Sequence, residues 1–479
     1  MQSIESDSLA IDRKARTYIP FEDLENRPVP ERLADFEDVV IEFTTERAMF
    51  EASRCIHCPD PAPCVAACPT RNDIPSAMWL IEQGLFLEAA KLYRQTSSMP
   101  EVCGRVCPHE QLCQGSCVHI KTGGPVLTGM LEAFVTSYER DTAGVTLPVG
   151  EPTGKKVAIV GAGPAGLSCA EQLRQFGHDV TIFEAKPEPG GLMVYGIPNF
   201  KLRKDIVFKR WSDLEKGGVK FVGNTYIGKN KTIDELFSEG YQAVFVGVGS
   251  EIDAPMEAPG EDLPGVYKAT EFLIRANVAA DMLPEGMTPL STIGHRVMVI
   301  GGGDTASDCL RTALRMGADE VTCLYRRTEK EMPGGRKDRE LARQEGARYQ
   351  FLTQPVRFIP GEDGRLAQIE CIHMVLGDPD AKGRRKPVPV EGSNFIVDAD
   401  IAILALGYWP DPVIGDTTPG LKTRNWGLVV ADPQTGATSR PGVYAGGDGV
   451  TGPDLVVTAM VAGRKSALAI DAYLKGLSN

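Results

Sequence analysis

The chain has 479 residues and a net charge of −13, with 42% hydrophobic and 24% charged residues. These values are typical of a soluble globular protein, with room for about three domains. The acidic balance argues against a nucleic-acid partner. No apolar run reaches the length of a membrane span, and the N-terminus lacks a signal-peptide pattern. We therefore expect a cytoplasmic protein with no nucleic-acid or membrane partner.

Eight of the twelve cysteines lie between residues 55 and 117, in two groups of four. Their spacing, with a Cys-Pro closing the first group, is typical of ferredoxin-like sequences that hold two four-iron clusters. Disulfides would need an oxidising compartment. Structural zinc is the alternative, but it usually pairs two short Cys-x2-Cys knuckles. The pattern favours two [4Fe-4S] clusters, with candidate ligands Cys55, Cys58, Cys64, Cys68, Cys103, Cys107, Cys113 and Cys117.

The segments around the cysteines predict a small α-helical domain over residues 1–150. We expect helices over 42–54, from Pro75 through Tyr93, and over 128–138. Residues 1–40 are polar and contain several prolines, as in a mobile arm or a wrapping segment. A linker rich in Gly, Pro and Thr is expected over 141–153.

The next segment has the order strand, G-x-G-x-x-G, helix, strand, acid. A strand over 155–160 leads into the glycines of 161–166, a helix over 167–176 and a strand that ends in Glu184. The glycines allow a tight turn, close approach to a pyrophosphate and close helix–strand packing. The helix N-terminus faces the pyrophosphate, and Glu184 can accept hydrogen bonds from ribose hydroxyls. This unit therefore predicts a dinucleotide with a free ribose.

A second unit of the same kind begins with a strand over 297–300. Its fingerprint runs from Gly301 to Ala306, and its next strand is followed by Arg326 and Arg327 instead of an acid. Guanidinium groups bind a 2′-phosphate in bidentate fashion, whereas a carboxylate would repel it. The second unit therefore predicts NADP(H), with a solvated surface pair as the alternative for the arginines.

Three further segments are consistent with a flavoenzyme of two nucleotide domains. Buried strands ending in glycine, over 243–249 and 401–407, are expected where the chain crosses between those domains. Near the C-terminus, a strand and turn end in Asp448, and an apolar helix is expected from Thr458. The predicted fold class is α/β, with an N-terminal α-helical iron–sulfur domain followed by two Rossmann-like domains.

The paired cysteine groups and the motifs VAIVGAGPAGL, PGGLMVYGIPNFKLR, VIGGGDTASDC, YRRTEKEMPG and GVYAGGD resemble the glutamate synthase small-subunit family. That family includes the large subunit of NADH-dependent ferredoxin:NADP oxidoreductase and the N-terminal half of dihydropyrimidine dehydrogenase. The resemblance covers nearly the whole chain from about residue 40. It implies an NADPH-dependent oxidoreductase with one FAD, one NADP(H) site and two [4Fe-4S] clusters. The FAD domain would span 151–255 and 409–479, interrupted by an NADP(H) domain over 256–408.

The resemblance also implies individual roles. FAD would be held by Gly161, Gly163, Pro164, Ala165, Gly166, Glu184, Gly190, Gly191, Leu192, Gly447, Asp448 and Thr458. NADP(H) would be held by Gly301, Gly303, Asp304, Thr305, Ala306, Arg326 and Arg327. One cluster would use Cys55, Cys58, Cys64 and Cys117. The other would use Cys68, Cys107, Cys113 and either Glu132 or Cys103, a choice that the sequence leaves open.

Hydride transfer requires no acid–base residue, so we predict none as catalytic. The cofactors would carry the chemistry, with electrons passing between NADP(H), FAD, the clusters and a partner chain. The partner would be a glutamate synthase large subunit. The alternatives are a small flavin/[2Fe-2S] subunit of a transhydrogenase or sulfide dehydrogenase, or ferredoxin. The second cysteine group, CGRVCPHEQLCQGSC, is closer to the transhydrogenase branch than to two-chain bacterial glutamate synthase. A zinc-containing scaffold with vestigial nucleotide folds is disfavoured by the intact fingerprints.

Overall fold

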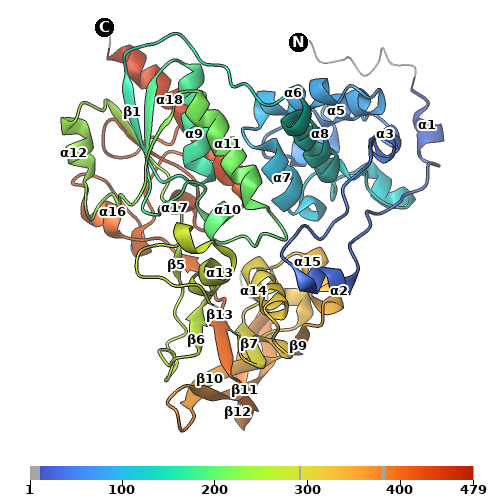
Figure 1. The fold of residues 1–479 in the computed structure, drawn as a ribbon, viewed down its shortest axis with the longest axis vertical. Helices are drawn as coiled ribbons and strands as arrows, with labels where there is room; N and C mark the ends of the chain where they lie inside the picture. Colours follow the sequence, from blue (N-terminus) through green and yellow to red (C-terminus); the bar gives the residue numbers. More distant parts are fainter. Residues whose placement is uncertain (1–10, 291–292, 380–382, 384, 478–479) are drawn as a thin grey trace.

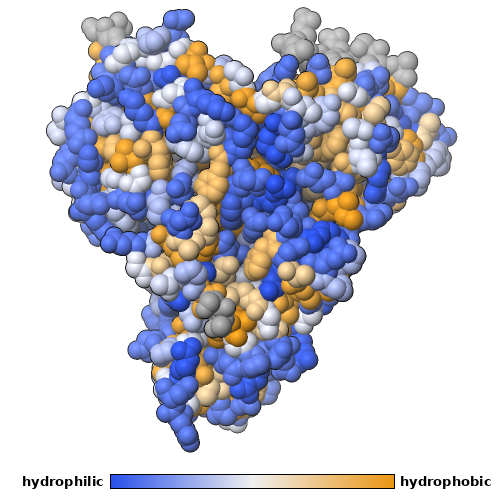
Figure 2. Space-filling model, in the orientation of Figure 1, coloured by the Kyte–Doolittle hydropathy of each residue, from blue (hydrophilic) through white to orange (hydrophobic). Residues whose placement is uncertain are grey.

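The computed structural model describes residues 11–290, 293–379, 383 and 385–477. The chain forms a helical part and two parts built around parallel sheets, and the three parts meet near the middle of the molecule (Figure 1). The face shown in Figure 2 is mostly hydrophilic, with apolar side chains in scattered small patches. No helix among the described residues is both long and apolar enough to cross a membrane.

The helical part is built from short helices. Thr44 caps one of them by accepting a hydrogen bond from the N–H of Arg47 at 3.3 Å. Gly84, with φ of 74°, separates two helices within the stretch from Pro75 to Tyr93 that the sequence predicts to be helical. The elements are α1 (Arg13–Arg16), α2 (Val29–Ala34), α3 (Thr45–Ser53), α4 (Pro63–Ala67), α5 (Ile74–Glu82), α6 (Phe86–Thr96), α7 (Pro100–Val106), η1 (His109–Gln111), η2 (Val118–Thr122) and α8 (Thr128–Thr142).

The first sheet is parallel, in the order β15-β4-β1-β2-β3. Helices α9 and α18 pack tightly against each other, since a Cβ on Gly463 would lie 2.0 Å from the carbonyl oxygen of Ala165. The elements are β1 (Lys156–Val160), α9 (Pro164–Gln175), β2 (Asp179–Phe183), α10 (Leu192–Tyr195), α11 (Lys204–Lys216), β3 (Lys220–Val222), α12 (Ile233–Ser238), β4 (Ala243–Val246), α16 (Val413–Asp416), η5 (Asn425–Gly427), β15 (Val443–Ala445), α17 (Asp448–Thr451) and α18 (Val456–Gly476).

The second sheet is also parallel, in the order β6-β13-β7-β8-β9. An antiparallel sheet, β10-β11-β12, extends from it and was not predicted from the sequence. The elements are β6 (Val266–Lys268), α13 (Ala269–Asn277), η3 (Ala280–Met282), β7 (Arg296–Ile300), α14 (Asp304–Arg315), β8 (Glu320–Tyr325), η4 (Glu329–Glu331), α15 (Arg336–Gln344), β9 (Arg348–Phe351), β10 (Thr353–Pro360), β11 (Leu366–Pro379), β12 (Arg385–Asp398) and β13 (Ile401–Leu404).

The chain crosses between the two sheets along a pair of short strands. Strands β5 (Ile252–Asp253) and β14 (Tyr408–Trp409) pair in antiparallel fashion, with Tyr408 opposite Asp253. The two glycine-ended segments expected at the crossings form the interior strands β4 of the first sheet and β13 of the second. The crossing follows directly after each of them. The second sheet is therefore inserted between β4 and β15 of the first.

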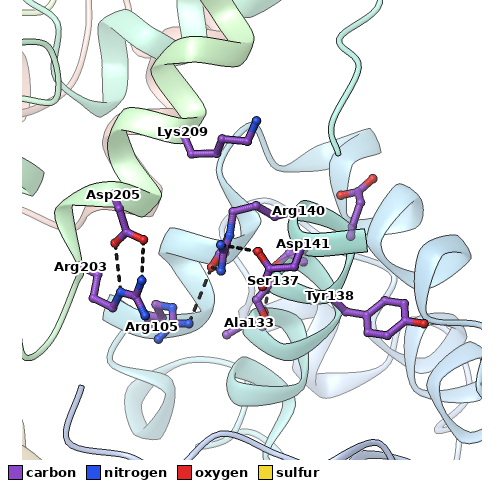
Figure 3. Close-up of polar contacts among 12 residues, drawn as sticks. Arg105, Ala133, Ser137, Tyr138, Arg140, Asp141, Arg203, Asp205 and Lys209 are labelled. Atoms are coloured by element: carbon purple, nitrogen blue, oxygen red, sulfur yellow. Dashed lines mark hydrogen bonds and ion pairs between the residues drawn. The ribbon is translucent and has the colours of Figure 1, made fainter. Parts of the chain in front are cut away.

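Charged side chains gather where the helical part meets the loop before α11 (Figure 3). The Arg203–Asp205 pair, joined at 2.6 Å, lies close to Arg105 of α7. Arg105 itself bonds Asp38 at 2.9 Å, and Arg140 of α8 bonds Glu101 at 3.1 Å. The Arg105 contact joins α7 to the N-terminal arm, and the Arg140 contact joins α8 to α7.

Candidate nucleotide and iron–sulfur sites

A cavity of about 790 Å³ lies where the three parts meet. The first glycine-rich loop lines it through Gly161 and Gly163, and the second through Asp304 and Thr305. The helical part contributes a stretch that includes Cys107. One cavity therefore borders both predicted nucleotide sites and one predicted cluster ligand.

The first glycine loop is closely packed on one side and open on the other. Gly161 has φ of 99°, and a Cβ there would lie 2.4 Å from the carbonyl oxygen of Gly247. A Cβ on Gly166 would lie 2.0 Å from the carbonyl oxygen of Gly161. By contrast, a Cβ on Gly163 would meet nothing within 4 Å. The loop thus leaves free space at the N-terminus of α9, where Pro164 and Ala165 also line the cavity, and a pyrophosphate fits such a position.

Glu184 lies directly after β2 and holds the same loop from the side. Its carboxylate accepts hydrogen bonds from the N–H groups of Ala162 at 2.7 Å and Lys186 at 3.0 Å. Burial raises the pKa of Glu184, and the positive charge of Lys186 opposes that rise. Glu184 also lines the cavity, as the predicted ribose contact requires.

A second turn packs against the loop from the opposite side. The N–H of Gly190 donates to the carbonyl oxygen of Ala162 at 2.9 Å. Gly191 has φ of 53°, and a Cβ there would lie 2.8 Å from the Cα of Gly163. Gly191 and Leu192 line the cavity. The predicted flavin-side residues are therefore adjacent to the predicted phosphate-side residues.

The segment after β15 forms another part of the lining of the large cavity. Gly447 and Asp448 line the cavity, and Oδ1 of Asp448 is buried with no hydrogen-bond partner among the described residues. Burial raises the pKa of Asp448 to about 6. Buried polar atoms are normally hydrogen-bonded, so this oxygen fits a site completed by a donor on a bound group.

Thr458 does not form the start of the last helix. Helix α18 begins at Val456, and the Thr458 hydroxyl donates to the carbonyl oxygen of Leu455 at 2.7 Å. Leu455 and Val456 line the cavity at this point, while Thr458 does not. Thr458, at the third helical position, bonds back to the residue that precedes the helix. This explains why the helix begins two residues before the start expected from the sequence.

The second glycine loop repeats the arrangement of the first. Gly301 has φ of 148°, and a Cβ there would lie 2.1 Å from the carbonyl oxygen of Ala405. A Cβ on Gly303 would meet nothing within 4 Å, whereas Ala306 is buried. The Asp304 carboxylate accepts from the N–H of Gly335 at 2.7 Å. This loop likewise leaves free space in front of a helix N-terminus.

Arg326 and Arg327 follow the end of β8, beside the second loop. A Cβ on Gly302 would lie 2.6 Å from the ring of Tyr325, so the strand end contacts the loop. Arg326 is exposed, and Nε of Arg327 donates to the carbonyl oxygen of Arg385 at 2.9 Å. Neither arginine lines the cavity. The contact with β12 was not evident from the sequence, because the antiparallel sheet was not expected.

The first predicted cluster ligands surround a small separate cavity. Burial raises the pKa of Cys55 to about 12, and the neighbouring thiols Cys117 and Cys58 add to the rise. Such groups become thiolates when they coordinate a metal centre. Four sulfurs around one space fit a [4Fe-4S] cluster, and the lining includes Cys55, Cys58, Cys64 and Cys117.

The second predicted group gathers around Glu132, which is buried. Burial raises the pKa of Cys113 to about 12, and the charges of Glu132 and Cys68 add to it. The Glu132 carboxylate accepts from the side-chain amide of Asn72 at 3.1 Å. Glu132 also adds to the raised pKa of Cys107. These four side chains therefore lie together, as a second cluster requires.

Cys103 lies in the same group. Its thiol is hydrogen-bonded to Cys107, which is the largest cause of the raised pKa of Cys107, and its charge also raises the pKa of Glu132. Cys103 and Glu132, the two candidates for the fourth ligand of the second cluster, therefore lie close together.

Among the described residues, no three His, Cys, Asp or Glu side chains are arranged to hold a single metal ion.

Two family models match the chain. Residues 32–143 match dihydropyrimidine dehydrogenase domain II, 4Fe-4S cluster. Residues 155–463 match the pyridine nucleotide-disulphide oxidoreductase family. These segments contain the cysteine groups and the two glycine loops, respectively.

The chain is similar to known proteins over most of its length. It is 42% identical to the glutamate synthase [NADPH] small chain of Halomonas elongata, over 95% of this chain and 96% of the relative. It is 38% identical to the NADP(+)-dependent formate dehydrogenase subunit beta of Moorella thermoacetica, over 86% of this chain and 60% of the relative. FprA of Mycobacterium tuberculosis in complex with NADPH shares the fold, with a TM-score of 0.58 at 23% identity, covering 68% of this chain and 86% of FprA. The chain therefore belongs to the pyridine nucleotide-disulphide oxidoreductase family and is a glutamate synthase small-chain type of NADPH-dependent oxidoreductase, with FAD, NADP(H) and [4Fe-4S] clusters as its cofactors.

Proposed function

We propose that this chain is the electron-transfer subunit of a larger enzyme and exchanges electrons between NADP(H) and the catalytic site of a glutamate synthase large subunit. The observation that carries the proposal is the shared cavity, which borders both glycine loops and Cys107. When bound, FAD, NADP(H) and the clusters supply hydride and single-electron transfer. The residues that line this cavity would hold these groups close together.

The FAD site would be formed by the loop of Gly161 to Gly166, the turn of Gly190 to Leu192 and the segment around Asp448. Its best support is the unpartnered Oδ1 of Asp448 on the cavity wall. The NADP(H) site would be formed by the loop of Gly301 to Ala306 with Arg326 and Arg327 at the strand end. We assign the domain boundaries accordingly, with residues 256–408 inserted into the FAD-binding part.

The two cysteine groups would act in sequence. Cys107, from the second group, lines the shared cavity, whereas the first group surrounds a different cavity. The second cluster would therefore be adjacent to the flavin, and the first cluster would be the one that faces the partner.

We assign Glu132 as the fourth ligand of the second cluster. Its charge acts on Cys68, Cys107 and Cys113, the three other members of that group. Cys103 is hydrogen-bonded to Cys107 and lies one helical turn before it in the chain. The more central position of Glu132 supports it over Cys103.

The choice of partner rests on the relatives. Identity to a glutamate synthase small chain extends over 95% of this chain, which supports the large subunit of that enzyme. The alternative is a small flavin/[2Fe-2S] subunit, as in a transhydrogenase or sulfide dehydrogenase, and the relative in Moorella is itself a formate dehydrogenase subunit. We further propose that the complex works in the cytoplasm, where thiols remain reduced.

The proposal is tested by tagging the chain in its native host and purifying it without oxygen. We expect a glutaminase-bearing partner, bound FAD, and about eight irons per chain. NADPH should bleach the flavin absorbance. A small flavin/[2Fe-2S] partner would instead establish the alternative. Stoichiometric zinc with little iron would overturn both.

A further inference from the structure

Lys201 joins the two nucleotide-binding parts inside the shared cavity. It lies in the loop between α10 and α11, next to the first sheet, and its Nζ is 2.9 Å from Oδ1 of Asp308 and 2.9 Å from Oδ2 of Asp338. Asp308 belongs to α14 and Asp338 to α15, both beside the second sheet. All three side chains line the cavity. Lys201 therefore connects the part that contains the predicted FAD site to the part that contains the predicted NADP(H) site, and a hydride would pass between these two parts.

The charges around Lys201 stabilise its ion pairs with Asp308 and Asp338. Asp308 and Asp338 raise the pKa of Lys201 against the effect of burial, and Asp304 adds to the rise. Asp338 also lies 3.5 Å from Arg311, whereas Asp308 depends on Lys201 and is only 8% exposed. Removal of the lysine would leave two carboxylates close together in a buried site, which disfavours the closed arrangement.

Phe200, directly before Lys201, anchors the same loop through a second set of contacts. The ring of Phe200 lies under the guanidinium groups of Arg315, at 4.0 Å, and Arg311, at 4.6 Å. Phe200 also packs in a small apolar cluster with Val39 of the N-terminal arm and Leu341 of α15. The loop therefore has an apolar anchor beside the ionic one, and it can stay docked while the lysine is tested.

The two ends of this bridge are connected to the two nucleotide loops. Asp308 lies one turn after Asp304 on α14, the helix whose N-terminus faces the predicted NADP(H) phosphates. Lys201 follows α10, which begins at Leu192 beside the predicted flavin. A change in the bridge would therefore shift one nucleotide relative to the other, and a misplacement of about 1 Å can cost roughly a hundredfold in rate.

We propose that Lys201 is a positioning residue that fixes the nicotinamide nucleotide relative to the flavin by bridging to Asp308 and Asp338. This inference rests on the two-nucleotide site proposed above. It predicts that the bridge sets the rate of hydride transfer and leaves the affinity for NADPH largely unchanged, because the phosphate contacts lie elsewhere.

The test is anaerobic stopped-flow reduction of the purified FAD-containing complex by NADPH, over a range of NADPH concentrations. Lys201→Met should lower the limiting rate of flavin reduction by roughly ten- to a hundredfold, with Kd for NADPH within about threefold of wild type. The charge-transfer absorbance between reduced nicotinamide and flavin should weaken. Lys201→Arg should recover most of both signals. Lys216→Met, an exposed lysine at the far end of α11, is the matched control and should behave as wild type.

Each outcome has a distinct meaning. If NADPH fails to reduce the wild-type flavin, the proposed function fails. If the wild type is reduced and Lys201→Met keeps its rate and charge-transfer band, the inference is overturned. It is also overturned if the variant loses NADPH affinity at an unchanged limiting rate. If Lys201→Met loses FAD, Asp308→Asn decides in its place: it should slow hydride transfer with FAD retained, and an unchanged rate rejects the bridge.

Discussion

Arg32 and Glu345 are distant in sequence, yet Nη1 of Arg32 lies 3.4 Å from Oε1 of Glu345 in the interior. Glu345 also accepts hydrogen bonds from Arg311 and Arg315, at distances down to 2.9 and 2.7 Å. Its side chain is 0% exposed. One carboxylate therefore joins the N-terminal arm to two turns of α14, and of the two sequence interpretations for the arm, the described residues show the wrapping one.

We expect Glu345→Gln to destabilise the protein more than Arg32→Met. The first change removes the carboxylate that Arg32, Arg311 and Arg315 share and leaves three buried guanidinium groups without it. Breaking a buried pair in this way costs about 3–5 kcal/mol. Loss of Arg32 leaves Glu345 paired with two arginines, so the cost should be smaller. Urea unfolding of the two variants measures the difference. Glu340→Gln, exposed on α15 just before Glu345, is the control. Equal midpoints for both variants would contradict the expectation.

The preference for NADPH should depend on Arg326 and Arg327. Charge-assisted hydrogen bonds contribute about 1.5–3 kcal/mol, so either change to Ala should weaken NADPH binding by roughly ten- to a hundredfold. NADH lacks the 2′-phosphate, and its affinity should barely change. Stopped-flow reduction of bound FAD by each nucleotide measures both values. Arg348→Ala, exposed on β9, is the control. Equal losses for NADH and NADPH would show that these arginines do not select the phosphate.

Local patterns in the sequence were sufficient to predict the two nucleotide-binding loops. The strand, glycine loop and following acid are consecutive in the chain, and the structure places Glu184 against Ala162 as that order implies. The helix after the first loop begins at Pro164 instead of the expected residue 167, because the loop itself supplies the first turn.

Contacts between distant segments could not be read from the sequence. The Lys201 bridge joins residues from a loop and two helices that have no common local pattern. The antiparallel sheet escaped notice because its strand β12 is exposed at most positions and therefore lacks a buried apolar alternation. The fourth cluster ligand stayed open because its position depends on how α8 packs against α7.

The iron content of single variants should identify that fourth ligand. If Glu132 is the ligand, Glu132→Ala should lower the iron from about eight to about four per chain and leave FAD bound. Cys103→Ala should keep all of the iron, since its thiol would then only support Cys107. Cys55→Ala is the matched comparison and should remove the first cluster alone. Anaerobic iron analysis with low-temperature EPR distinguishes the clusters, and loss of one cluster in Cys103→Ala but not in Glu132→Ala would reverse the assignment.

Lys204 should make the stability of the protein depend on pH. The residue is 9% exposed, and its ammonium donates to the carbonyl oxygens of Met193 and Ile197. Burial lowers its pKa to about 7, from the ordinary value of 10.5. Between these two values the unfolded chain binds the proton more tightly than the folded one, so the stability rises with pH across that window and the penalty is complete below it.

The corresponding measurement compares urea midpoints of wild type and Lys204→Met from pH 7 to pH 9. The variant lacks the titrating group, so the wild type should gain stability relative to it, by up to about 2 kcal/mol at the higher pH. The lost hydrogen bonds to Met193 and Ile197 lower the stability of the variant by an amount that does not depend on pH. Lys209→Met, on the same helix and more exposed, should follow the wild-type trend. A constant difference between wild type and Lys204→Met across this range would mean that Lys204 stays charged in the folded protein, with its ammonium fully satisfied by the two carbonyl oxygens.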